Sequence, residues 1–184
     1  MALAPTLYDF DVHLAHVDRG LDARLAIKAA RHPSESMERL WLRVLAWCLF
    51  HQERIAFGPG LSDPDEPDLL AEDLTGERVL WVRVGRPDPE RLQREADRAH
   101  RAHVAVLFDS PARLAAFCGE AREKRLPRLG RVELAAVDPA LLRQLAAAED
   151  RRSRFSLTVV GDHLYVERGG ATFDGPLTRE NLQP

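Results

Sequence analysis

The chain has 184 residues, of which 45% are hydrophobic and 30% are charged, and its formal net charge is −3. These values fit one globular domain and exclude a disordered, collagen-like or membrane-spanning chain. The acidic balance excludes a generally basic nucleic-acid coat, although it allows a local basic groove. The two cysteines, Cys48 and Cys118, lie in apolar stretches and are too few for a disulfide framework or a zinc cluster, so we expect two buried thiols.

The N-terminal region predicts a β-hairpin. Residues 6–17 alternate between apolar and polar side chains, which is the period of a half-buried strand. After a turn signal at 18–20, residues 21–29 alternate in the same way; their content of Ala, Leu and Arg also suits a helix, but the unbroken period of two favours a second strand. The first five residues have neither a basic nor an apolar segment, so we expect no secretory signal and a cytoplasmic location.

A long apolar helix is predicted after this hairpin. Ser34 is a suitable N-cap, and residues 37–51 are apolar on most sides apart from Arg39 and Arg43. Such a helix is expected at the centre of the molecule. Glu38 falls on the same side as three leucines, where a carboxylate is costly unless it is paired or binds a metal; the alternative is that Glu38 only complements the positive end of the helix.

The rest of the chain alternates strands and helices and ends in a second hairpin. Strands are predicted at about 68–73, 79–84, 103–108 and 131–137, helices at about 87–102, 111–125 and 139–149, and hairpin strands at 155–160 and 163–166. This order predicts one α/β or α+β domain over 1–184, in which helices flank a mixed central sheet. The core would cover about 34–137, with terminal hairpins at about 6–30 and 154–175.

Two charged residues belong to predicted strands, one at the start of a strand and one within a strand. Asp68 opens a strand directly after a proline, so its carboxylate can be aimed, whereas the acidic residues before it fit a solvated loop. Arg83 lies within an apolar strand on the same face as Trp81. There it could stack on the indole, bind phosphate or pair with an acid, and we favour pairing with Asp68 or Glu38.

Arginines also follow one face of the predicted helix at 87–102. Arg91, Arg94, Arg98 and Arg101 are separated by three, four and three residues, which is the spacing of a phosphate-contacting stripe. Acids four residues before two of these arginines can neutralise the stripe, so a solvated face is the favoured interpretation. Under the alternative that the protein binds nucleic acid, the candidate phosphate-binding residues are Arg83, Arg86, Arg91, Arg94 and Arg98. Nearby, His100 and His103 complete no zinc motif.

Several stretches, in order along the chain, resemble the YaeQ family of bacterial proteins. They are Tyr8-Asp9-Phe10, Ala30-Arg31-His32-Pro33-Ser34-Glu35, Gly60-Leu61-Ser62-Asp63, Asp65-Glu66-Pro67-Asp68-Leu69, Asp73-Leu74-Thr75-Gly76-Glu77, Leu80-Trp81, Val84-Gly85 and Pro87-Asp88. The resemblance weakens beyond about residue 110. It implies the PD-(D/E)XK nuclease-like, or restriction-endonuclease-like, fold. In that fold a helix carboxylate, the Asp of a Pro-Asp strand and an acid-x-Lys on the next strand gather Mg²⁺ and a water.

Carried onto this chain, the resemblance gives a degenerate candidate catalytic site of Glu38, Asp68 and Arg83. Glu38 would be the helix acid and Asp68 the strand acid, and these two would be weak metal ligands. The family pattern implies an acid at position 83 and a lysine at position 85, where this chain has Arg83 and Gly85. Because a cation close to Asp68 favours an Arg–Asp pair over a dication, Mg²⁺ is disfavoured and no cofactor is certain.

The sequence therefore predicts a catalytically degenerate protein that binds nucleic acid. One alternative is a protein-interaction or regulatory module on the same fold, with an unidentified protein partner. A second alternative is an Mg²⁺-dependent nuclease in which another acid, such as Glu77 or Asp88, has moved into the site. None of these interpretations involves a membrane.

Overall fold

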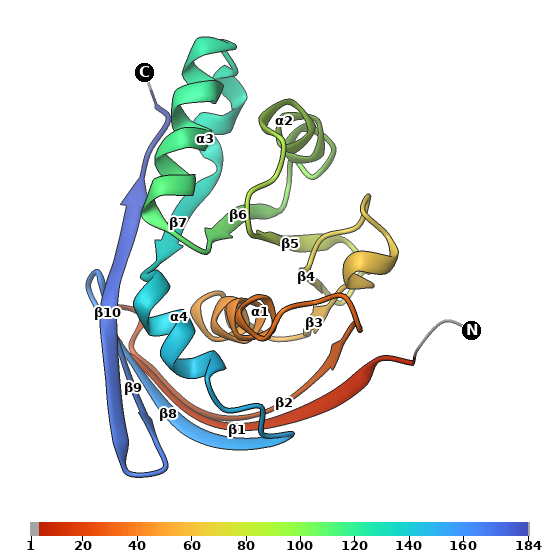
Figure 1. Cartoon of the computed structure of the whole chain (residues 1–184). Helices are drawn as coiled ribbons and strands as arrows, with labels where there is room; N and C mark the ends of the chain where they lie inside the picture. Colours follow the sequence, from red (N-terminus) through yellow and green to blue (C-terminus); the bar gives the residue numbers. More distant parts are fainter. Residues whose placement is uncertain (1–3, 184) are drawn as a thin grey trace.

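The computed structural model describes residues 4–183, and within them ten strands form one mixed sheet that curls around a central helix (Figure 1). The strands are β1 (Thr6–His16), β2 (Leu21–Arg31), β3 (Ile55–Phe57), β4 (Leu69–Glu72), β5 (Arg78–Val84), β6 (His103–Phe108), β7 (Glu133–Val137), β8 (Arg152–Val160), β9 (His163–Arg168) and β10 (Ala171–Glu180). The α-helices are α1 (Met37–Leu49), α2 (Pro89–Arg98), α3 (Pro111–Glu123) and α4 (Pro139–Ala146). Three short 3₁₀ helices are η1 (Val17–Arg19), η2 (Gly60–Ser62) and η3 (Pro127–Arg131).

The strand order is β2-β1-β8-β9-β10-β7-β6-β5-β4-β3. Strands β5, β6 and β7 run parallel to one another, β1 runs parallel to β8, and the remaining neighbours are antiparallel. Strand β10 pairs with β9 along its first half and with β7 along its second half. The two terminal hairpins are therefore not appendages beside a core sheet, because β10 joins them to the central strands as one sheet.

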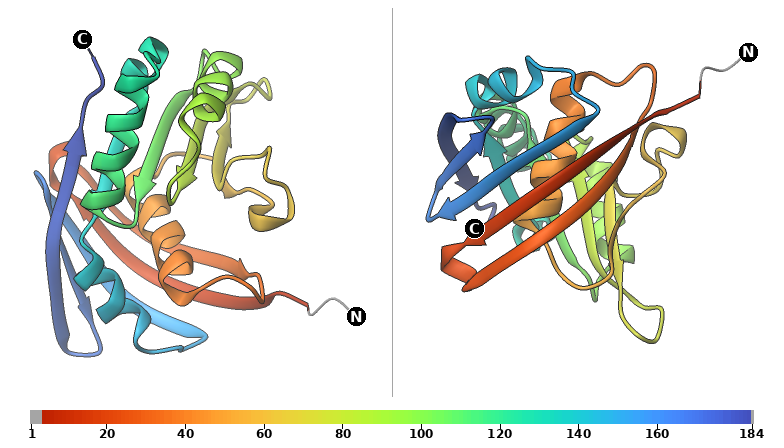
Figure 2. Two further views of the ribbon diagram at one scale, coloured as in Figure 1. Left: turned by 45° about the horizontal axis from the view of Figure 1, so that its top comes forward. Right: turned by 90° about the horizontal axis from the view of Figure 1, so that it is seen from below.

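The N-terminal hairpin is confirmed, with β1 and β2 paired along their whole length. The alternation in β1 turns Tyr8, Phe10, Val12 and Leu14 inward, and it continues to His16, which is also buried. Gly20 makes the turn with a φ of 60°, a left-handed conformation that glycine adopts without steric cost. Figure 2 shows β1 and β2 crossing beneath α1.

Helix α1 is central, as its composition predicts, and is covered on most sides by the curled sheet and by α4 (Figure 1). Trp41 packs its ring 5.1 Å from Phe10 and 5.2 Å from Phe155, centroid to centroid. The predicted N-cap is wrong by two residues. The cap is Ser36, whose hydroxyl accepts a hydrogen bond from the backbone N–H of Arg39 at 3.1 Å.

The sheet separates two hydrophobic layers. The inner layer surrounds α1 and α4, while α2 and α3 cover the outer face of β5, β6 and β7 (Figure 2). Cys48 lies in the inner layer and Cys118 in the outer one, and both are free thiols, as expected. Burial raises the pKa of Cys48 to about 12, so this thiol is an inert core group.

The structure differs from the predicted elements in one strand that was not predicted and in several boundaries. Strand β3 is too short to show a period in the sequence, and α2 ends at Arg98 rather than near residue 102. No helix within residues 4–183 has both the length and the apolar composition needed to cross a membrane.

Candidate functional site

Asp68, the carboxylate singled out by the sequence, is buried just before β4 at 4% exposure. Its backbone N–H donates to the carbonyl of Val82 at 2.9 Å, which fixes its position against β5. One carboxylate oxygen accepts from the backbone N–H of Val84 at 2.9 Å, and the other accepts from Nη2 of Arg39 at 2.5 Å. Both oxygens are therefore occupied by protein donors, and the cation beside Asp68 comes from α1.

The carboxylate that completes this group is Glu35, which lies just before the N-cap of α1. One oxygen of Glu35 accepts from Arg39 at 2.9 Å and from Nε of Arg43 at 2.8 Å, and the other accepts from Nη2 of Arg43 at 2.7 Å. The Glu35 and Arg43 side chains are only 2% and 4% exposed. Burial opposes the charge on Arg39, but Asp68 and Glu35 outweigh burial and raise the pKa of this guanidinium. We call Glu35, Arg39, Arg43 and Asp68 the buried ion-pair network.

Glu38 takes no part in this network, and the expectation that it lies on an apolar face is wrong. Its side chain is exposed to solvent. The physical reason is where the helix begins: α1 starts at Met37, so Glu38 lies in the first turn on the solvent side. Glu35 precedes the helix and can turn its carboxylate into the interior. The interpretation that Glu38 only complements the helix end fits this position.

Arg83 does pair with an acid, but the acid is Glu95 of α2 rather than Asp68 or Glu38. Nε and Nη2 of Arg83 donate to the two oxygens of Glu95 at 2.9 and 2.6 Å, and Nε1 of Trp81 donates to the same carboxylate at 3.3 Å. Arg83 lies on the outer face of the sheet, under α2, whereas Asp68 pairs with α1 on the inner face. The sheet separates the two residues, so Arg83 cannot supply the cation next to Asp68.

The other candidate phosphate-binding arginines divide into paired and exposed ones. Arg86 pairs with Glu120 at 2.5 Å, and Arg91 pairs with Glu95 at 3.0 Å and with Asp65 at 2.9 Å. Arg94 and Arg98 are exposed on α2. The acids predicted to neutralise the stripe have different partners, because Glu90 pairs with Lys124 at 3.3 Å and Asp97 pairs with Arg128 at 2.7 Å.

The chain's donor set at Asp68 does not fit Mg²⁺. A hard dication needs carboxylate oxygens that face it, and both oxygens of Asp68 already accept from Arg39 and Val84. On the neighbouring strand β5, position 83 offers no carboxylate either, because it carries the guanidinium of Arg83, which is paired with Glu95. Across the described part of the chain, no three side chains of the His, Cys, Asp and Glu types come together in a way that could hold a metal.

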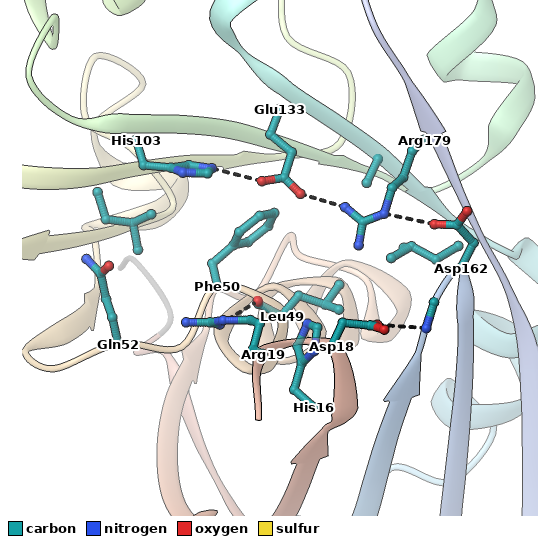
Figure 3. A pocket seen from close by; sticks show the side chains of 14 residues that line it. His16, Asp18, Arg19, Leu49, Phe50, Gln52, His103, Glu133, Asp162 and Arg179 are labelled. Carbon is teal, nitrogen blue, oxygen red and sulfur yellow. Dashed lines mark hydrogen bonds and ion pairs between the residues drawn. The ribbon is translucent and has the colours of Figure 1, made fainter. Parts of the chain in front are cut away.

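A second polar site, not anticipated from the sequence, lies at the other end of the central strands. Asp68 contacts the C-terminal end of β5, whereas His103 and Glu133 begin β6 and β7, which run parallel to β5. Their N-terminal ends border a cavity of about 550 Å³ between the two halves of the curled sheet (Figure 3). The lining residues are His16, Asp18, Arg19, Leu49, Phe50, Gln52, Leu80, His103, Glu133, Ala135, Gly161, Asp162, Leu177 and Arg179. We call this space the inter-sheet cavity.

A chain of ion pairs forms one wall of this cavity (Figure 3). Nε2 of His103 lies 2.9 Å from one oxygen of Glu133, and Nη1 of Arg179 donates to the other at 2.6 Å. Nε of Arg179 then donates to Asp162 at 3.0 Å. The hydrogen bond from His103, assisted by Arg179, lowers the pKa of Glu133 below its ordinary value, so this carboxylate is ionised.

The facing wall comes from η1 and the end of β1. Asp18 accepts a hydrogen bond from the backbone N–H of Gly161 at 2.7 Å. Arg19 donates to the carbonyls of Leu49 and His51 at 3.1 and 2.8 Å, which places its charge at the negative end of α1. Burial and the charge of Arg19 lower the pKa of His16, which keeps this imidazole neutral near pH 7.

Only one feature of the sequence indicates a residue of this cavity, and only weakly. The alternation of β1 reaches His16, the next inward position after Leu14. Nothing in the sequence connects His16 with Glu133 or Arg179, because these residues lie in separate strands that meet only in the folded sheet.

Comparison with known proteins settles the family. A sequence model of the YaeQ protein matches residues 1–175. The chain belongs to the YaeQ family. It is 35% identical to YaeQ of Escherichia coli strain K12 over 162 residues and 34% identical to YaeQ of Salmonella typhi over 160 residues, covering 86% of each chain in both pairs.

Two crystal structures of YaeQ proteins are close to this fold. The protein from Xanthomonas axonopodis pv. citri superposes with a TM-score of 0.86 at 26% identity, over 98% of this chain and 99% of that one. The protein from Pseudomonas syringae gives 0.82 at 30% identity, over 95% of each chain. The curled mixed sheet around α1 is therefore the architecture of this family.

Proposed function

We propose that this protein binds nucleic acid without cutting it, on a nuclease-like framework that has lost its metal site. The order of elements supports the framework: β4 comes after helix α1 and the short strand β3, it begins directly after the Pro-Asp pair, and it pairs with β5, which carries position 83. The observation that carries the proposal is the Arg39–Asp68 pair at 2.5 Å. A guanidinium in contact with this carboxylate repels the dication that hydrolysis would need.

The α2 face is the surface proposed to contact the phosphates. Arg94 and Arg98 are exposed there and are not needed for the Arg83–Glu95 pair beneath them. A hollow of about 300 Å³ lies beside Arg98, and its wall includes two arginines that are already paired with acids, Arg78 with Glu66 and Arg101 with Glu77, so Arg94 and Arg98 are the arginines proposed to meet phosphates. Exposed arginines can hold the phosphates of a nucleic acid and position its backbone.

Binding is tested by fluorescence anisotropy with labelled single- and double-stranded DNA and RNA. Contacts to two phosphates predict that affinity falls about tenfold between roughly 50 and 200 mM salt. Changing both Arg94 and Arg98 to Ala should weaken binding and make it less dependent on salt. The control is Arg143→Ala, because Arg143 is an exposed arginine of α4, on the other face of the sheet from α2. Equal affinity of the double variant and the control would refute the proposed surface.

The non-hydrolytic part has a separate test. We expect no cleavage when the protein is incubated with Mg²⁺ or Mn²⁺ and mixed DNA and RNA. The comparison is Asp68→Ala, which removes the carboxylate on which the nuclease-like site would depend. Cleavage by the wild-type protein above the level of this variant would show that an active metal site exists.

A further inference from the structure

The inter-sheet cavity has the properties of a built binding site. Its volume of about 550 Å³ falls within the roughly 300–1,000 Å³ typical of small-molecule pockets. Within the described residues, two buried polar atoms of its lining have no hydrogen-bond partner, namely Nδ1 of His16 and Nε2 of Gln52. His16 is only 5% exposed, and a buried polar group without a partner is costly. Both atoms are themselves covered, so a bound molecule relieves that cost when the side chain turns toward it.

The charges around the cavity do not favour an anion. Arg179 lies between Glu133 and Asp162, and Arg19 sits on the last carbonyls of α1. Neither guanidinium therefore presents an uncompensated positive charge to a phosphate or a carboxylate. Glu133 is paired on both oxygens, by His103 and Arg179, so a simple cation finds no open carboxylate there. The other two carboxylates of the lining, Asp18 and Asp162, belong to exposed residues and are solvated, so they do not draw a cation into the cavity. The cavity is thus suited to an uncharged molecule.

The remaining groups specify what such a molecule must carry. The bonds from Arg179 to Glu133 and Asp162 use Nη1 and Nε, and Figure 3 shows the third nitrogen of this guanidinium pointing into the cavity. That nitrogen is a donor, so it requires an acceptor such as a carbonyl oxygen. The ring of Phe50, together with Leu49, Leu80 and Leu177, supplies an apolar surface for a flat molecule.

We propose that the inter-sheet cavity binds an uncharged, planar heterocycle with a carbonyl oxygen, of the size of a nucleoside. The carbonyl accepts from the free nitrogen of Arg179, the ring lies against Phe50, and its polar edge approaches His16 and Gln52. This proposal is independent of nucleic-acid binding at α2, which concerns the outer face of the sheet.

The test is isothermal titration calorimetry of the full chain with uridine, guanosine, adenosine, uridine monophosphate and inorganic phosphate. Uridine or guanosine should bind, while adenosine, which has no carbonyl, should bind about tenfold more weakly because the nitrogen of Arg179 then faces the ligand without an acceptor. The monophosphate should bind no more tightly than its nucleoside, and inorganic phosphate should give no heat. Preference for phosphate or the monophosphate, or no binding of any nucleoside at millimolar concentration, would overturn the proposal.

A matched pair of variants tests the role of Arg179. Arg179→Met keeps an unbranched side chain of similar length but removes the donor, so it should abolish the preference for a carbonyl-bearing nucleoside over adenosine. Arg143→Met makes the same change at an exposed site on α4 and should leave this preference intact. Gln52→Leu provides a second variant if Arg179→Met fails to fold, and it should lower nucleoside affinity. Unchanged preference in Arg179→Met, or unchanged affinity in Gln52→Leu, would contradict the assignment.

Discussion

The buried ion-pair network and the inter-sheet cavity are both polar, but their hydrogen bonding differs. In the network, both oxygens of Glu35 and both oxygens of Asp68 accept from arginine or backbone donors. In the cavity, His16 and Gln52 keep buried nitrogens without partners. The comparison teaches that a carboxylate singled out by the sequence, Asp68, can belong to a structural network, whereas polar groups without partners beside an open space indicate where a ligand can bind.

The largest expected effect comes from opening the network at Glu35. Glu35→Gln removes the charge opposite Arg43, whose side chain is 4% exposed, and leaves a buried guanidinium without its counter-ion. We expect a loss of about 3–5 kcal/mol in the free energy of unfolding, measured by urea denaturation. Glu38→Gln is the matched control, because Glu38 is exposed three residues later and should change stability by less than about 0.5 kcal/mol. Equal losses in the two variants would mean that Glu38, and not only Glu35, supports the fold.

The Arg39–Asp68 pair should show a smaller but measurable coupling. A double-mutant cycle with Arg39→Ala and Asp68→Asn isolates the interaction of the two side chains, which approach to 2.5 Å. We expect a coupling energy of about 1–3 kcal/mol, because Asp68 is buried while Arg39 keeps 25% of its side chain exposed. Additive single effects would show that the pair does not hold α1 against β4.

The cavity should make stability depend on pH through His16. Burial lowers the pKa of this imidazole below the ordinary value of 6.5, so the unfolded chain takes up a proton at a higher pH than the folded chain does. Its contribution to stability is therefore complete above pH 6.5 and is lost as the pH falls through the lower pKa of the folded state.

Urea denaturation at about pH 7.5 and about pH 5.5 measures this effect. His16→Leu should show a smaller drop in the free energy of unfolding between these values than the wild type does. His100→Gln, at an exposed position, should behave as the wild type. The same drop in His16→Leu as in the wild type would assign the pH dependence to other groups, such as His51, whose pKa burial also lowers.

The smallest effect is expected from divalent cations. Because both oxygens of Asp68 are occupied, Mg²⁺ and Mn²⁺ should leave the Tm of the wild-type protein unchanged in a thermal melt. A rise in Tm that disappears in Asp68→Asn would instead place a metal at the network. The network, and not only the inter-sheet cavity, would then be a ligand site.

Much of the secondary structure followed from local patterns in the sequence. The alternation over residues 6–29 specified β1 and β2, and the apolar stretch after residue 37 specified a central helix. The special position of Asp68 was also visible, since a strand follows it directly. Patterns of this kind are local, because side-chain period and the residue types at turns act over a few neighbouring residues.

Local patterns in the sequence did not show which distant residues form ion pairs with each other. The sequence suggested Asp68 or Glu38 as the partner of Arg83, but the partner is Glu95, because the sheet places Arg83 and Asp68 on opposite faces. Arg39 and Arg43 lie on α1, and both pair with Glu35 rather than with Glu38. The reason is that α1 begins at Met37, which leaves Glu38 on the solvent side of the first turn.

The amino-acid sequence by itself determined the family, the order of most elements and the presence of a charged residue, Arg83, within an apolar strand. Only the tertiary structure decided which carboxylate each arginine neutralises, and only the closing of β10 between β9 and β7 created the inter-sheet cavity. The physical reason is that ion pairs and cavities depend on distances between strands far apart in the chain, and those distances are set when the curled sheet packs around α1.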